Sequence, residues 1–341
     1  MNKKTIWILP LLLIFSCKQS NRTEAFPQLS NWEFKMVSRG NNRPGFDTMK
    51  DSIHFIPILL HNGYKASTIR EHFGWSEEDF NKKVEVLITN SFLNKSANVF
   101  VPAVMVISEQ EAKKMREDLS PIVNQIVKTI VDLKTDISEK TESVSCFEPF
   151  TMDELSLLVF SNVLLDSGQL NNIEREYLRT ERPERNKSRY YASYQEKENP
   201  SVEALGIYGN HVQPYNEFML CRYGNQRYTL EVLEMNAQIH NTYQTLKEGE
   251  VFDYPIVTAE CQLEIQALAD YYKPYLLDVL NNNDSLLRKI YGDSAYSNEV
   301  SYEEYFMWVY HILYSEVTDA LVVSGDIVLP QETVSFYVFQ P

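Results

Sequence analysis

The sequence predicts an α+β fold for this chain, on three observations. Apolar residues recur at helical spacing behind capping boxes, such as Ser108 with Glu111. Short β-rich runs, such as residues 99–107 and 333–339, are bounded by turn residues. Hydrophobic residues make up 44% of the 341 residues, so the chain can bury a sizeable core.

The N-terminus carries the pattern of an exported protein. Lys3 and Lys4 make a basic start, and residues 6–15 form an apolar run that only Pro10 interrupts. A run of about ten residues is too short for a hydrocarbon core, which needs about twenty. Ser16 supplies the small residue that normally precedes a cleavage site. We therefore predict that residues 1–16 are a signal peptide.

Residues 14–17, Ile-Phe-Ser-Cys, resemble the lipobox of bacterial lipoproteins, although the family prefers Leu and then a small residue at the first two positions. The resemblance implies that Cys17 becomes an acylated N-terminus, and more than one acyl chain makes anchoring stable. Lys18 stands where an inner-membrane retention signal usually has Asp, which favours the outer membrane, on its periplasmic or surface face. Residues 17–30 would form a polar tether. The alternative is an ordinary signal peptide with an incidental cysteine.

The predicted mature chain is strongly acidic. Loss of Lys3 and Lys4 leaves 30 basic against 47 acidic residues, a net charge of −17. Such a surface repels nucleic acid and anionic lipid at long range, so we expect no nucleic-acid partner.

Three cysteines remain in the mature chain, Cys146, Cys221 and Cys261. Export would place them in an oxidising compartment, where a disulfide persists. An odd number allows one bridge at most, and the spacings match no metal motif. The sequence leaves two alternatives open, one disulfide or three buried thiols.

The first structural region begins after a loop-rich segment at residues 31–47. Helices are predicted at residues 53–60, 66–73 and 76–90, followed by a turn at residues 94–98 and a strand at residues 99–107. Ser76 is expected to cap the third helix. This order resembles a winged-helix domain, which we place, with the amphipathic helix that follows it, at residues 48–133.

Many winged-helix domains bind DNA through the third helix. In this chain that helix would begin with Glu77, Glu78 and Asp79, and their carboxylates would face phosphate. We therefore expect a winged-helix-like module that contacts protein. The alternative is a cytoplasmic winged-helix regulator, if the N-terminus does not direct export.

The second half differs in composition, because 20 of the 21 tyrosines lie at or after Tyr177. This predicts a boundary in the polar residues 135–148 and a mixed, tyrosine-rich domain at residues 149–341. The helices are expected at residues 152–165, 170–178, 263–280 and 301–323, and the strands at residues 188–195, 204–208 and 217–223. Residues 300–339 repeat the layout of residues 76–107, which predicts a second winged-helix-like unit.

Two patterns in the sequence carry residue types that are used in catalysis or metal binding. His54, His61 and His72 could bind zinc, although ordinary helix and loop residues explain them better. A second set, Glu304, His311 and Asp319, could share a helix face with acid–base potential, although helical amphipathicity explains the same pattern without catalysis. The sequence has no Gly-rich phosphate loop, HExxH or GxSxG. We therefore expect no catalytic residue, cofactor or metal.

One dense basic cluster is the candidate binding site. Its members are Arg179, Arg182, Arg185, Lys187 and Arg189, with Tyr190 and Tyr191. The residues that we expect to bind are Arg182, Arg185, Arg189, Tyr190 and Tyr191. Arginine and tyrosine together suit phosphate, carboxylate or sugar contacts, whereas a solvated loop is the alternative. The sequence thus predicts a non-enzymatic interaction or binding lipoprotein of the cell envelope with a protein partner. An envelope hydrolase acting on peptide or glycan is the alternative function.

Overall fold

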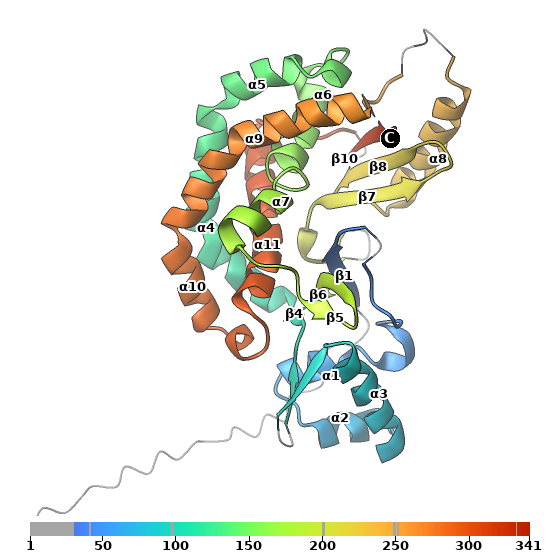
Figure 1. Ribbon diagram of the computed structural model, residues 1–341, viewed down its shortest axis with the longest axis vertical. Helices are drawn as coiled ribbons and strands as arrows, with labels where there is room; N and C mark the ends of the chain where they lie inside the picture. Colours follow the sequence, from blue (N-terminus) through green and yellow to red (C-terminus); the bar gives the residue numbers. More distant parts are fainter. Residues whose placement is uncertain are drawn as a thin grey trace, which may run out of the picture. The chain divides into compact units, whose positions relative to one another are not determined.

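The computed structural model describes residues 31–341, apart from residues 41, 97–98, 200–201, 248–249, 251 and 332 (Figure 1). The described chain is α+β, as predicted, and contacts join residues 31–341 into one unit. The predicted signal peptide, Cys17 and the tether lie outside the described residues. Among the residues that are described, no helix is long and apolar enough to cross a membrane.

The first sheet joins segments from both predicted domains. β6 (Ser188–Glu196) pairs antiparallel with β1 (Trp32–Ser38) on one side and parallel with β4 (Met105–Ile107) on the other. A short strand, β5 (Glu184–Arg185), forms a hairpin with β6. The prediction of a loop-rich segment at residues 31–47 was therefore wrong for β1, since its partner strand lies about 150 residues away and leaves no local signal.

Three short helices and a two-stranded sheet follow β1 in the predicted order. They are α1 (Phe55–His61), α2 (Ala66–His72), α3 (Glu77–Thr89), β2 (Leu93–Ser96) and β3 (Val99–Pro102). A 3-10 turn, η1 (Lys50–Ser52), precedes them. Ser76 caps α3, because its hydroxyl accepts the Asp79 N–H at 3.1 Å. We call these five elements the N-terminal module.

The second sheet has the strand order β7-β8-β10-β9. Its strands are β7 (Gly209–Pro214), β8 (Met219–Gly224), β10 (Val334–Phe339) and β9 (Ile256–Val257). A helix, α8 (Leu230–Thr245), contributes Val232 and Ile239 to an apolar cluster with the sheet residues Leu220 and Phe336. The strand predicted at residues 204–208 is instead a 3-10 turn, η5 (Ala204–Gly206), in which Leu205 has a φ of +57°.

The remaining helices form the core beside the sheets (Figure 1). Before β5 they are α4 (Glu109–Asp132), α5 (Lys134–Glu142), η2 (Ser145–Phe147), α6 (Met152–Ser156), the π-helical η3 (Leu157–Val163), α7 (Leu170–Asn172) and the π-helical η4 (Ile173–Leu178). After β9 they are α9 (Ala259–Asn282), α10 (Asp284–Gly292), η6 (Ala295–Asn298) and α11 (Tyr302–Ser324). The capping box of Ser108 and Glu111 is confirmed, and α4 continues through Pro121. The boundary predicted in the polar residues 135–148 is mostly helical, in α5 and η2.

An internal repeat relates these two sets of helices. Three helices of the first set begin 150 residues before their counterparts in the second set. The matched starts are Glu109 of α4 with Ala259 of α9, Lys134 of α5 with Asp284 of α10, and Ser145 of η2 with Ala295 of η6. A capping residue, Thr151 in one set and Ser301 in the other, then begins the next helix. The strand before each set, β4 or β9, pairs parallel with the strand that ends it, β6 or β10. Two halves of the chain therefore share one layout.

The two halves are packed across each other. α11 of the second half packs on α4 of the first, and η3 of the first half packs on α9 of the second. Equivalent buried side chains, such as Ile126 and Leu276, belong to the same hydrophobic cluster. The predicted ranges 48–133 and 149–341 consequently share one core as well as the first sheet.

This repeat differs from the one predicted for residues 300–339. α11 and β10 do form there, but residues 327–329 are not in a strand. β10 instead pairs with β8 and β9, so the β-hairpin expected of a wing does not form. The prediction of a second winged-helix-like unit was wrong because a helix, a turn and a strand can equally belong to a larger sheet.

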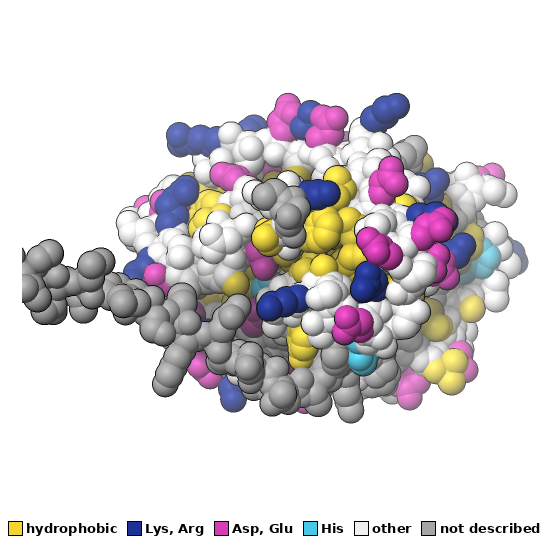
Figure 2. Space-filling model, turned by 90° about the horizontal axis from the view of Figure 1, so that it is seen from below, with side chains coloured by type: hydrophobic (Ala, Val, Ile, Leu, Met, Phe, Trp, Pro, Cys, Tyr) yellow, Lys and Arg dark blue, Asp and Glu magenta, His cyan; other side chains and the backbone are white. Residues whose placement is uncertain are grey.

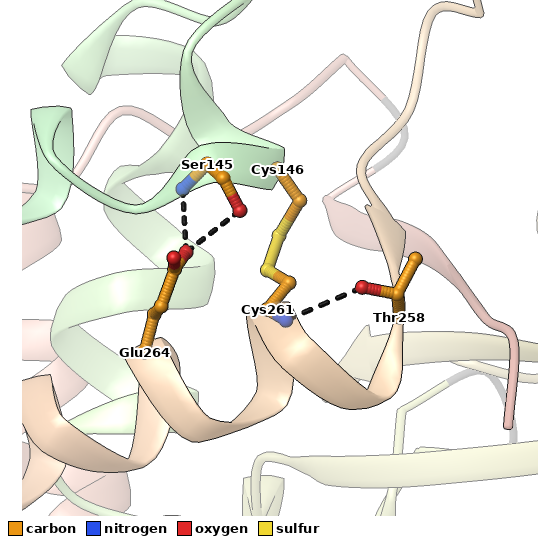
Figure 3. Close-up of a disulfide and its surroundings, with 5 residues drawn as sticks. All are labelled: Ser145, Cys146, Thr258, Cys261 and Glu264. Atoms are coloured by element: carbon orange, nitrogen blue, oxygen red, sulfur yellow. Dashed lines mark hydrogen bonds between the residues drawn. A yellow bond between two sulfur atoms is a disulfide. The ribbon is translucent and has the colours of Figure 1, made fainter.

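A disulfide joins the two halves at the start of α9 (Figure 3). Cys146 in η2 is bonded to Cys261 in α9, with 6.0 Å between their Cα atoms. Beside it, the N–H and hydroxyl of Ser145 both donate to Glu264 at 2.7 Å. Cys221 is a buried free thiol. Of the two alternatives that the sequence left open, the structure has the single disulfide.

Candidate binding site

The predicted basic cluster lies around the β5–β6 hairpin. The two turn residues, Asn186 and Lys187, have φ values of +47° and +70°, the left-handed conformation that a two-residue hairpin turn requires. The turn brings Arg189 opposite Glu184. The five predicted residues are therefore close in space, but the strands direct their side chains into different environments.

Three of the five predicted residues point into the protein. Arg185 is buried, and its guanidinium donates to both carboxylate oxygens of Glu304 at 2.5 and 2.6 Å. Tyr190 and Tyr191 are fully buried, and burial raises the pKa of the Tyr190 hydroxyl to about 12. These residues hold β6 against α11, so they are unavailable to an external ligand.

Arg182 forms the base of a pocket with Glu174. Its Nε and Nη2 atoms donate to the two oxygens of Glu174 at 2.5 and 3.1 Å. Arg39 at the end of β1 pairs with the same carboxylate. Only 9% of Arg182 is exposed, and its buried Nη1 has no hydrogen-bond partner among the described residues. A buried unpaired donor is costly, so this atom marks a place where a ligand acceptor would be stabilising.

The pocket above this pair has a volume of about 590 Å³. We call it the arginine pocket, and its lining is Arg39, Asn42, Asn171, Glu174, Arg175, Thr180, Glu181, Arg182 and Arg189. About half or more of the side chain of each of Arg39, Arg175 and Arg189 is exposed.

Charges around the arginine pocket are balanced rather than uniformly positive. Arg189 pairs with Glu181 and Glu184 at 2.9 Å, and Arg175 pairs with Glu176 at 2.8 Å. A guanidinium has five N–H donors, and these ion pairs use only part of them. The arginines can thus still bind a carboxylate or phosphate through their forked donor geometry. A ligand would weaken some surface ion pairs, each of which contributes little to stability.

The three histidines do not form a metal site. His54 is buried, and burial lowers its pKa to about 4, while His72 is an exposed residue of α2. His61 lies between Glu111 and Glu299, with 2.7 Å from each ring nitrogen to a carboxylate oxygen. Within the described residues, no group of three or more His, Cys, Asp or Glu side chains could hold a metal ion.

The acid–base candidates of α11 are occupied by structural contacts. Glu304 is paired with Arg185, and Asp319 accepts a hydrogen bond from the Tyr208 hydroxyl at 2.9 Å. His311 is buried, its Nδ1 lies 2.7 Å from the Met307 carbonyl, and burial lowers its pKa to about 4. α11 is buried on nearly all sides rather than amphipathic, so these polar side chains make contacts inside the core.

No family model matches the chain, and neither a curated protein nor a solved structure matches it. The site therefore rests on its own geometry. Sequence reasoning found Arg182 and Arg189 but missed Arg39, Glu174 and Arg175. The alternating run of β1 was the available signal for Arg39, while nothing local indicated that Glu174 would be buried.

Proposed function

We propose that this protein is an exported lipoprotein of the bacterial cell envelope, anchored through Cys17 and facing the periplasm or surface from the outer membrane. It binds a partner or ligand and does not catalyse a reaction. The Cys146–Cys261 disulfide is the observation that carries the export proposal, because disulfides persist in oxidising compartments. The N-terminal pattern of residues 1–17 is consistent with it.

The chemical group that the protein recognises is proposed to be an anion, a carboxylate or a phosphate, held in the arginine pocket. Support comes from Arg182, whose Nη1 donor is buried without a partner among the described residues, and from three exposed arginines around it. In a protein with net charge −15 this cluster is the most favourable place for an acidic group of a protein or glycan.

Anchoring is tested with metabolic palmitate labelling and cell fractionation of the full chain and of Cys17→Ala. The unaltered protein should incorporate palmitate and sediment with membranes, and Cys17→Ala should do neither. If both proteins are unlabelled and soluble in the cytoplasm, the export proposal fails, and the alternative of a cytoplasmic regulator is favoured.

Anion binding is tested by titrating the protein with acetate and with inorganic phosphate while NMR follows the arginine Nε–H resonances. Arg182→Lys keeps the charge but removes the fork, so it should weaken binding by about tenfold. Arg70→Lys on α2 is the matched control and should leave binding unchanged. Equal affinities for all three proteins would contradict the proposal.

We also propose that the N-terminal module, residues 55–102, is winged-helix-like and contacts protein. The element order supports it, and the first turn of α3 carries three acidic residues. Figure 2 shows the face of the molecule seen from the lower side of Figure 1, where hydrophobic side chains gather among charges of both signs. The protein should not retard duplex DNA in a gel, whereas salt-dependent retardation at micromolar protein would contradict a protein-contact role.

A further inference from the structure

A second, chemically different cavity lies between the second sheet and the helices of both halves. It has a volume of about 320 Å³, and its apolar lining includes Leu158, Val163, Met219, Val257, Ile265 and Phe339. None of the described residues that line it is charged. It shares no residue with the arginine pocket. Its size falls at the lower end of ligand pockets, which are roughly 300–1,000 Å³.

One wall of this cavity is a π-helix. The π-helical turn η3 (Leu157–Val163) contributes Leu158, Asn162 and Val163 to the lining. Its widened bonds include Leu164 N–H to Val159 O at 3.0 Å. The equivalent segment of α11 is regular α-helix. π-helical turns are rare and are found frequently at functional sites, so this wall supports a ligand-binding role.

The internal repeat shows how the cavity is left open. Leu158 occupies the position that Trp308 occupies in the other half, 150 residues later. Trp308 is only 2% exposed, so the larger side chain is buried in the core at that position. The smaller leucine leaves a volume between the two halves that the described side chains do not fill.

A polar group lies at one side of the cavity. Asn162 accepts hydrogen bonds from Asn210 at 2.6 Å and from the Ser167 hydroxyl at 2.7 Å. Tyr337 donates to Asn210 at 2.9 Å. Ser167 and Gln262 are exposed residues that line the cavity, so they can also contact a ligand's polar end.

We propose that this cavity binds a small uncharged molecule with an apolar body and one hydrogen-bonding group, such as an alcohol, an amide or an aromatic amine. The apolar lining provides most of the affinity, and Asn162 orients the polar group. A charged ligand is disfavoured because the described lining offers no counter-charge. The proposal goes beyond the anion proposal and does not depend on export.

The test is a fluorescence titration with N-phenyl-1-naphthylamine, an uncharged aromatic amine. The protein is used from residue 31 onward, because the described core, both sheets and the disulfide lie there. Binding should be saturable with one site. Val163→Trp, which fills the cavity, should weaken it at least about tenfold. Val323→Trp adds the same side chain at a residue that is 89% exposed, and should bind as the unaltered protein does.

NMR of ¹³C-labelled methionine methyl groups tests the location without any substitution. Addition of the amine should shift the resonance of Met219, which lines the cavity, and leave Met36 on β1 unchanged. The proposal is overturned if the unaltered protein shows no saturable binding, or if binding leaves Met219 unperturbed. It is also overturned if a folded Val163→Trp protein binds as well as the unaltered one.

Discussion

The two halves of the repeat contact each other at two equivalent places, and the chemistry of the two contacts differs. We call them the covalent joint and the polar joint. In one joint, Cys146 of η2 is bonded covalently to Cys261 of α9. In the other, the equivalent residues are Tyr296 of η6 and Glu111 of α4, each 150 residues away from its counterpart. Glu111 lies close enough to Tyr296 to contribute, after burial, to the raised pKa of its hydroxyl. A covalent bond at one contact between the halves thus corresponds to a polar cluster at the other.

The polar joint includes a residue from outside the repeat. His61 of α1 stacks on Tyr296, with 5.1 Å between ring centroids, and lies between Glu111 and Glu299. Burial by itself would lower the pKa of His61, but hydrogen bonds and charge interactions with the two carboxylates outweigh it and raise the pKa to about 10. His61 is therefore a cation at neutral pH, and the same cluster that closes this joint fixes the N-terminal module to the helical core.

Removal of the disulfide at the covalent joint should cause the largest loss in the free energy of unfolding. The disulfide closes a loop with a sequence separation of 115 residues. Its removal in the double variant Cys146→Ala, Cys261→Ala should lower the free energy of unfolding by about 4 kcal/mol, because the unfolded chain gains freedom. Chemical denaturation followed by circular dichroism measures it.

A reducing agent separates the disulfide from simple loss of packing. It should destabilise the unaltered protein and Cys221→Ala, which keeps the bridge, and leave the double variant unchanged. A double variant that responds to reduction as strongly as the unaltered protein would show that the stabilising bridge lies elsewhere.

Breaking the polar joint with His61→Ala should lower the free energy of unfolding somewhat less, by about 3 kcal/mol. His61→Ala removes the cation between two carboxylates, of which the Glu299 side chain is only 9% exposed. A buried charge without its partner is strongly destabilising, and the 32% exposure of the Glu111 side chain reduces the effect. His72→Ala on the exposed side of α2 should change stability by less than about 0.5 kcal/mol. Equal losses for the two variants would contradict a special role for His61.

The sequence predicted the parts of this architecture that have local signals. The capping boxes and apolar stripes located α4, α9 and α11, because a helix is specified by residues within one or two turns. The elements that were missed include β1, α5, α8, α10 and β7. β1 depends on a distant partner strand, and α5 is polar along most of its length, so its helical state depends on packing of Ile137.

The candidate sites were less predictable for the same reason. A dense basic run identified Arg182 and Arg189, but it could not show that Arg185 would pair with Glu304, 119 residues later. The repeat was also invisible as sequence identity. It is visible in element bounds and in matched burial, such as Ile130 with Leu280, rather than in shared residues.

The repeat itself can be probed by exchanging equivalent residues. Trp308→Leu introduces the residue that the other half has at position 158, and it should cost about 2 kcal/mol through the void it leaves. Loss of the indole N–H, which is buried with no partner among the described residues, offsets part of that cost. The reverse exchange, Leu158→Trp, enters a cavity of about 320 Å³ and should cost less. A larger cost for Leu158→Trp would contradict the equivalence of the two positions.

The smallest effect near neutral pH should be the pH dependence of the stability that the polar joint contributes. The folded-state pKa of His61, about 10, lies above its unfolded value of 6.5, so its stabilisation is complete below pH 6.5 and is lost as pH rises toward 10. From pH 7 to pH 8 the loss should be about 1 kcal/mol, since the unfolded state has already released most of this proton. The difference between the unaltered protein and His61→Ala isolates this group from other titrating side chains. That difference should shrink steadily as pH rises, and a difference that stays constant from pH 6 to pH 9 would mean that His61 is not held as a cation in the folded protein.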